Sequence, residues 1–183
     1  MTKRAFIPAL SCAIFLTAAT TPPAHAGEKT WNDAGSITRD ALVIAAFGVP
    51  LAQSDWDGTL QAGGSLVAAA GVTAGLKQAF PERRPDGSDN KGFPSGHTSV
   101  SFAAAATLQN RYGWKVGLPA QALATFVGLS RVEARKHHVH DVLVGAAIGE
   151  ASGFLITRRA SDRVQVFPWA DAGGGGVAMT MRF

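Results

Sequence analysis

Five Ala-rich apolar segments dominate the chain, and each is long enough for a helix. They span residues 36–53, 59–80, 97–112, 118–136 and 141–158. Their length and their content of good helix formers favour helices over strands. Ser36 is expected to cap the first helix, and Asp57 or Thr59 the second. Because Pro and Gly interrupt the intervening linkers, the sequence predicts an all-α fold, a helical bundle of about five helices.

The N-terminal segment has the features of a secretory signal peptide. Lys3 and Arg4 precede a mostly apolar stretch, which ends in the small-residue pattern Ala24-His25-Ala26. We therefore expect residues 1–26 to be cleaved and the mature protein to be periplasmic. The single cysteine, Cys12, would leave with this segment, so no disulfide is expected.

The C-terminal segment differs from the helical block. Residues 163–167 and 177–183 alternate polar and apolar side chains on either side of the tetraglycine 173–176. This alternation around a flexible turn predicts a short C-terminal β-hairpin-like tail. The mature chain is thus expected to consist of a helical domain over residues 27–160 and a tail over 161–183.

Charge and hydropathy restrict the partners of the mature chain. The full sequence has 17 Lys and Arg against 13 Asp and Glu, and loss of Lys3 and Arg4 leaves 15 minus 13, or +2. This small excess gives no reason to expect a nucleic-acid partner. The longest uncharged stretch, residues 58–76, contains Gln61 and several Gly and Ser, whereas a spanning helix needs about 20 predominantly apolar residues. We therefore expect a soluble domain or one with peripheral membrane contact.

Histidines indicate where the chemistry lies. Apart from His25, the chain has His97 and a cluster of His137, His138 and His140. The cluster has three interpretations. The first is a solvated helix end, in which polar side chains satisfy terminal carbonyls. The second is a metal site with Asp141 as a further ligand, and the third is part of a nucleophilic centre.

The third interpretation pairs His137 with Asp141 at i,i+4 on one helix face. The carboxylate would accept a hydrogen bond from one ring nitrogen and leave the other free for nucleophilic attack. The charges and neutral donors nearby suit a phosphate group; they are Lys77, Arg84, Arg131, Ser95 and Gly96.

Three motifs carry a family resemblance. Lys77 precedes Arg84-Pro85 by six intervening residues, Pro94-Ser95-Gly96-His97 follows, and Ser130-Arg131, His137 and Asp141 complete the set with gaps of five and three residues. They resemble the tripartite signature of the type 2 phosphatidic acid phosphatase superfamily, which also contains bacterial class A acid phosphatases and vanadium haloperoxidases. Every fixed position matches in order, and the family core is α-helical.

The resemblance implies a role for each matching residue. His137 would attack phosphorus and form a phosphohistidine, Asp141 would orient it, and His97 would protonate the leaving oxygen and then activate water. The non-bridging oxygens would be held by Lys77, Arg84, Ser95, Gly96 and Arg131. Because cationic side chains stabilise the transferring group, no metal or other cofactor is expected.

The expected function is a metal-independent periplasmic phosphatase. The substrate is a lipid phosphate, a prenyl pyrophosphate or a soluble phosphomonoester, because the motifs specify only the phosphate end. Two alternatives remain at this point. One is vanadate-dependent haloperoxidase activity at the same site, and the other is a non-catalytic phosphate-binding or membrane-attached interaction protein.

Overall fold

The computed structural model describes residues 27–159, 164–171 and 174–181. The helices are α1 (Glu28–Ala52), α2 (Trp56–Ala79), α3 (Gly96–Tyr112), α4 (Trp114–Glu133) and α5 (Val139–Ile156), and the strands are β1 (Val164–Asp171) and β2 (Gly174–Met181). The strands pair antiparallel. The expected all-α bundle with a hairpin tail is therefore confirmed, whereas the expected signal peptide, residues 1–26, lies outside the described residues.

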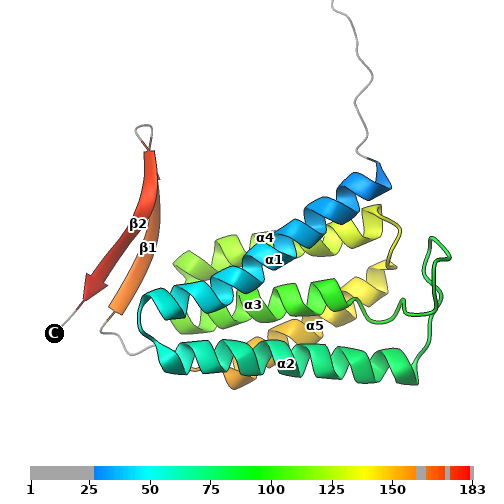
Figure 1. The fold of residues 1–183 in the computed structure, drawn as a ribbon, viewed down its shortest axis with the longest axis horizontal. Helices are drawn as coiled ribbons and strands as arrows, with labels where there is room; N and C mark the ends of the chain where they lie inside the picture. Colours follow the sequence, from blue (N-terminus) through cyan, green and yellow to red (C-terminus); the bar gives the residue numbers. More distant parts are fainter. Residues whose placement is uncertain (1–26, 160–163, 172–173, 182–183) are drawn as a thin grey trace, which may run out of the picture.

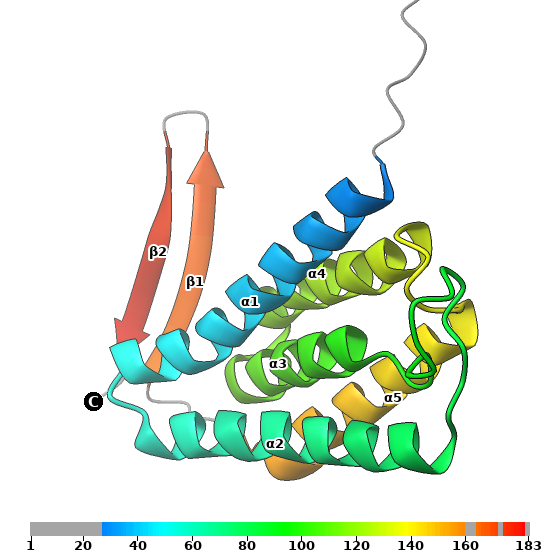
Figure 2. The ribbon, with the colours of Figure 1, turned by 45° about the vertical axis from the view of Figure 1, so that its right-hand side comes forward.

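Helix α3 occupies the centre of the bundle and packs against the other four helices (Figures 1 and 2). The C-termini of α2 and α4 and the N-termini of α3 and α5 lie together at the right-hand end of the bundle in Figure 1. The loop between α2 and α3 and the turn between α4 and α5 lie at the same end. Segments that are far apart in the sequence thus meet at one place.

The interior is built from small side chains. Ala103, Ala104, Ala105 and Ala106 of α3 are fully buried. The facing surface of α5 carries Gly145, Gly149 and Gly153 at intervals of four residues, which places all three on one side of the helix.

The glycine stripe of α5 lies directly on the α3 backbone. A Cβ atom added to Gly145 would lie 2.6 Å from the carbonyl oxygen of Ser95, and one added to Gly153 would lie 2.9 Å from the amide nitrogen of Thr107. A Cβ on Gly149 would collide with the carbonyl oxygen of Ser99. Only glycine therefore permits this approach of the two helices.

Large apolar side chains lie mostly on the outside of the bundle. Ile44 in α1, Leu60 in α2, Leu143 in α5 and Leu155 in α5 are each at least 64% exposed, whereas alanine predominates in the core. The space between α2 and α5 forms an apolar groove of about 640 Å³, lined in part by Val72 and Leu143. In a typical soluble domain the large apolar side chains are mostly buried, so their placement here is the reverse.

Several helix boundaries differ from the expected ones. Helix α1 begins at Glu28, so Ser36 lies inside it and donates to the carbonyl of Asn32 instead of capping the helix. Asp55, and neither Asp57 nor Thr59, caps α2 by accepting a hydrogen bond from the amide of Gly58. The reason is that capping depends on local backbone geometry, and several polar residues near each start are competent caps.

The close contact between α3 and α5 makes a prediction about stability. We expect Gly149→Ala to destabilise the protein by about 1–3 kcal/mol, because the added methyl group forces the two backbones apart. The control is Gly71→Ala in α2, where an added Cβ meets nothing within 4 Å. That variant should be stabilised by up to about 1 kcal/mol, since alanine restricts the unfolded chain and favours the helix. Thermal unfolding of both variants measures the difference, and equal changes would contradict the packing described.

Candidate active site

The residues expected from the motifs come together at the end of the bundle where four helix termini meet. Lys77 is in the last turn of α2, Arg131 is in the last turn of α4, and His97 is in the first turn of α3. Arg84 belongs to the loop after α2, and Asp141 to the first turn of α5. Cations at helix C-termini also offset the partial negative charge of the terminal carbonyls.

His137 is held by the backbone of a loop. Its side chain is 3% exposed, and its Nδ1 lies 2.6 Å from the carbonyl oxygen of Gly92. A carbonyl only accepts hydrogen bonds, so Nδ1 carries the proton and Nε2 of the neutral ring keeps its lone pair. Burial, followed by the charges of Arg84 and Lys77, lowers the pKa of His137 to about 4. The ring is therefore a neutral base at pH 7.

The expected helical pairing of His137 with Asp141 is wrong. Arg135 has a φ of 53°, a left-handed conformation that ends α4, and α5 starts only at Val139, so His137 lies in the turn between them. Nδ1 of His137 is 3.6 Å from Oδ2 of Asp141, too far for a hydrogen bond. The carboxylate instead accepts a hydrogen bond from the amide of His138 at 2.7 Å. Asp141 acts on His137 through its charge, and Gly92 fixes the ring.

His97 contacts a cation that the motifs do not include. Its Nε2 lies 2.8 Å from Nη1 of Arg39 and 3.3 Å from Oγ of Ser36, both in α1. Because a guanidinium only donates, this contact requires a lone pair on Nε2. Burial, followed by the charges of Arg39 and Arg131, lowers the pKa of His97 to about 4. His97 is thus neutral at pH 7 before an anion binds.

The three expected cations are held in place by neighbouring oxygens. Lys77 Nζ donates to the carbonyls of Lys91 and Pro94 at 2.8 and 2.5 Å, and burial lowers its pKa. Arg84 Nε donates to Asp89 at 2.7 Å.

Arg131 is 1% exposed and is anchored to α1. Its Nη1 donates to Oδ1 of Asn32 at 3.1 Å, and its Nη2 donates to the carbonyl oxygen of the same residue at 2.6 Å. Ser130 supports it as well, because Nε of Arg131 donates to Oγ of Ser130 at 3.3 Å. Arg131 is therefore preorganised before any anion binds.

The remaining neutral donors belong to the start of α3. Ser95 is fully buried, its Oγ lies 2.8 Å from Oγ1 of Thr98, and its amide donates to the carbonyl oxygen of Asp141 at 3.0 Å. Gly96 is the first residue of the helix, where an amide has no intrahelical acceptor. A helix N-terminus with such amides is suited to binding an anion.

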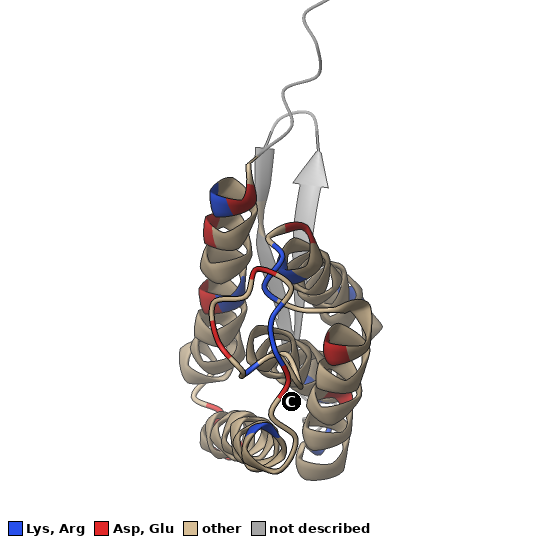
Figure 3. Cartoon of the chain, turned by 90° about the vertical axis from the view of Figure 1, so that its right-hand side faces the viewer, with Lys and Arg blue, Asp and Glu red and all other residues tan. Residues whose placement is uncertain are grey.

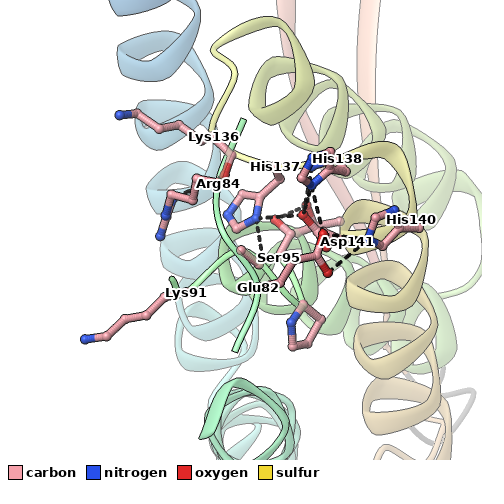
Figure 4. Close-up of polar contacts among 12 residues, drawn as sticks. Glu82, Arg84, Lys91, Ser95, Lys136, His137, His138, His140 and Asp141 are labelled. Atoms are coloured by element: carbon pink, nitrogen blue, oxygen red, sulfur yellow. Dashed lines mark hydrogen bonds and ion pairs between the residues drawn. The ribbon is translucent and has the colours of Figure 1, made fainter. Parts of the chain in front are cut away.

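The charges gather at this end of the bundle. Viewed from that side, Figure 3 shows charged residues on the first half of α1 and on the loop between α2 and α3. Arg84 lowers the pKa of both His97 and His137, so the two imidazoles belong to one electrostatic site. In the close-up, His137 lies between Arg84 and Asp141 (Figure 4). The arrangement can bind a dianion and present a nucleophilic nitrogen to it.

Reasoning from the sequence missed three contributors to this site. Asn32 anchors Arg131, Arg39 contacts His97, and the Gly92 carbonyl orients His137. A signal existed for α1, because Asn32, Ser36 and Arg39 follow spacings of four and three residues and therefore share one face of the polar first half of the helix. No signal existed for Gly92, since any residue offers a carbonyl.

Comparison with known proteins identifies the family. The model of the PAP2 superfamily matches residues 58–165. The chain is 33% identical to the lipid A 4'-phosphatase of Helicobacter pylori over 148 residues, which cover 75% of this chain and 74% of that protein. It is 34% identical to the lipid A 1-phosphatase of Porphyromonas gingivalis over 119 residues, which cover 62% of this chain and 26% of that protein. The chain therefore belongs to the PAP2 superfamily, as its motifs indicated.

Two crystal structures share the fold. LpxE of Aquifex aeolicus aligns with a TM-score of 0.61 at 19% identity, over 70% of this chain and 83% of that one. A transmembrane PAP2-type phosphatidylglycerolphosphate phosphatase of Bacillus subtilis aligns with a TM-score of 0.51 at 24% identity, over 70% and 74% of the two chains. The helical core described above is thus a known architecture.

The contact between Arg39 and His97 predicts a shift in pH dependence. In Arg39→Gln, the loss of a repelling charge and of a donor to the neutral ring should raise the pKa of His97. His97 would then stay protonated to higher pH, and the alkaline limb of the kcat/KM profile should shift to higher pH. The measurement is the profile from about pH 3 to 9.

The control for this prediction is Arg83→Gln. Arg83 is exposed and lies in the same loop as Arg84, but it is not among the largest influences on the pKa of His97. We expect its profile to match the wild type. An unchanged alkaline limb in Arg39→Gln, or a limb displaced to lower pH, would contradict the assigned influence of Arg39.

Proposed function

We propose that this chain is a lipid phosphate phosphatase that works through a phosphohistidine on His137. The observation that carries the proposal is the neutral, buried His137, whose free Nε2 is accompanied by Arg84 and Lys77. The family membership and the phosphatase relatives support hydrolysis of a phosphoric ester. Pure anion binding would need the cations only, and it leaves the orientation of this imidazole unexplained.

In the first half-reaction, Nε2 of His137 attacks phosphorus. A P–N bond forms and the bridging P–O bond breaks, and the electron pair of that bond goes to the leaving oxygen. His97 supplies a proton to this oxygen, so that the product leaves as an alcohol. The bound phosphate carries negative charge, which raises the pKa of the nearby His97 and gives it the proton it must donate.

In the second half-reaction, water attacks the phosphohistidine. His97, now neutral, accepts a proton from the water; the P–N bond breaks and inorganic phosphate leaves. Throughout, Lys77, Arg84 and Arg131 face the non-bridging oxygens together with the amide of Gly96 and the hydroxyl of Ser95. Donors that are already in place stabilise the developing charge without reorganising.

A membrane-associated location supports a lipid substrate. Helices α1 and α5 are long and apolar enough to cross a membrane by length and composition, and 22% of each hydrophobic window is buried inside the bundle. These helices also expose large apolar side chains, among them Ile44 in α1 and Leu155 in α5, which acyl chains would cover. We propose that the active-site end lies at the membrane surface, on the periplasmic side, where it meets phosphorylated lipid headgroups.

The first experiment tests the nucleophile. In His137→Ala, phosphate release from a lipid phosphate in mixed micelles should fall by at least about a thousandfold, as expected for loss of a nucleophile. A chelator should leave the wild-type rate unchanged, because the phosphate contacts are cationic side chains. The panel consists of a glycolipid phosphate, a diacylglycerol phosphate, a prenyl pyrophosphate and a soluble phosphomonoester. Retained turnover in the variant, with an unchanged circular dichroism spectrum, would overturn the assignment.

The second experiment separates the two tasks of His97. An aryl phosphate with a good leaving group needs no protonation, so His97→Ala should still form the phosphoenzyme from it, whereas hydrolysis of the phosphoenzyme should become slow. We expect a burst of about one phenol per chain and an acid-labile phosphate label on the protein. A variant that hydrolyses the aryl phosphate with no burst and no label would show that His97 does not activate water.

A further inference from the structure

Four side chains form a second polar cluster behind the catalytic histidine. They are Glu82 in the loop after α2, His138 at the N-cap of α5, and His140 and Asp141 in the first turn of that helix. One nitrogen or oxygen atom from each lies within 4.8 Å of the others. In Figure 4, His140 lies on the opposite side of Asp141 from His137 and Arg84.

The distances within the cluster suit a small divalent cation. Glu82 Oε1 is 3.0 Å from His138 Nδ1 and 2.9 Å from His140 Nε2, and Asp141 Oδ1 is 3.2 Å from His140 Nε2. Bonds of about 2.0–2.2 Å in tetrahedral geometry separate neighbouring ligand atoms by about 3.3–3.6 Å. The three distances above are a few tenths of an ångström shorter than this spacing, whereas the most distant of the four atoms, within 4.8 Å of each other, would have to move together by about an ångström.

Two buried atoms of the cluster, Nδ1 of His138 and Oδ1 of Asp141, make no well-aligned hydrogen bond among residues 27–159. Each has only ion-pair contacts, the shortest with Glu82 at 3.0 Å and with His140 at 3.2 Å, and the Asp141 side chain is fully buried. Poor alignment weakens a hydrogen bond. A cation between the imidazoles and the carboxylates would satisfy both atoms.

A bound ion would replace protons in this cluster. The imidazoles of His138 and His140 are stacked, with their centroids 5.2 Å apart and their planes 9° from parallel. Without an ion, Nε2 of His140 donates a hydrogen bond to Glu82 at 2.9 Å. A cation would displace such a proton and accept the lone pair of the ring nitrogen, as metal binding to imidazole requires.

We propose that Glu82, His138, His140 and Asp141 bind a divalent transition-metal ion, of which Zn²⁺ fits best. Two imidazole nitrogens with two carboxylate oxygens are typical of zinc, whereas Mg²⁺ and Ca²⁺ prefer oxygen ligands alone. Glu82, His138 and His140 are partly exposed, so the ion has a route from solvent, and Asp141 forms the floor of the site.

The site would brace the catalytic loop. The carbonyl oxygen of Glu82 accepts a hydrogen bond from the amide of Gly92 at 2.7 Å, and Glu82 also pairs with Lys91 through an isolated β-bridge. Gly92 is the residue whose carbonyl orients His137. An ion that links Glu82 to the start of α5 would tie the loop to the helix and stabilise the fold without touching the phosphate. The hydrogen bonds of Gly92 to Glu82 and to His137 hold the catalytic ring when no ion is bound, so loss of the ion is expected to lower stability and not the rate. Its role is positional, and the chemistry of the proposed phosphatase needs no metal.

The test is metal binding to the purified full chain after treatment with a chelator. Titration with Co²⁺ should give the visible absorption of a four-coordinate ion, and Zn²⁺ should displace it at one ion per chain. Glu82→Gln and His140→Ala should each weaken binding by at least about tenfold. Zn²⁺ should raise the unfolding temperature of the wild type and leave that of these variants unchanged.

A matched control separates the site from general surface charge. Glu133→Gln makes the same chemical change as Glu82→Gln at an exposed glutamate at the end of α4, and it should bind Co²⁺ as the wild type does. Equal Co²⁺ affinity in the wild type, Glu82→Gln and His140→Ala would overturn the proposal, as would a wild type without the absorption of a four-coordinate ion. In that second case, the four side chains form hydrogen-bonded ion pairs and do not bind a metal ion. Because binding is measured directly, neither outcome depends on phosphatase activity.

Discussion

The contact between the glycine stripe of α5 and the backbone of α3 is the constraint on which the rest of the structure depends. Gly145, Gly149 and Gly153 allow α5 to lie directly on α3, and an added methyl group at any of them would collide with α3. This contact brings the first turns of the two helices together, where the Ser95 amide donates to the Asp141 carbonyl. The same contact places His97, in the first turn of α3, at the same end of the bundle as His137, which lies two residues before α5.

The second constraint is electrostatic. Four cations, Lys77, Arg84, Arg131 and Arg39, lie around the two histidines, and the first three of them are held by oxygens of α1 or of the α2–α3 loop. Holding like charges together costs free energy in the empty fold, and a bound dianion recovers it. Burial and the same charges together lower the pKa of both imidazoles and keep the rings neutral at pH 7. In the proposed mechanism this makes His137 the nucleophile and makes protonation of His97 depend on the bound substrate.

Much of this arrangement could be predicted from the sequence. The number of helices followed from Ala-rich segments and breakers, and the motifs selected Lys77, Arg84, Arg131, His97 and His137, all of which the fold brings to one end. The hydrogen bond expected between His137 and Asp141 was wrong, because a left-handed Arg135 ends α4 early and places His137 outside the helix. The sequence left three interpretations of the cluster that contains His138 and His140, because its partner Glu82 is distant in the sequence.

The amino-acid sequence by itself determined which elements form and which side chains carry the chemistry, because helix propensity, breakers and motif spacing are local properties of the chain. Only the tertiary structure decided which groups touch. The Gly92 carbonyl on His137, Arg39 on His97 and Asn32 on Arg131 join segments separated by dozens of residues. Which of these groups come into contact depends on how closely the helices pack. The spacing between the helices depends in turn on the small side chains at the α3–α5 contact.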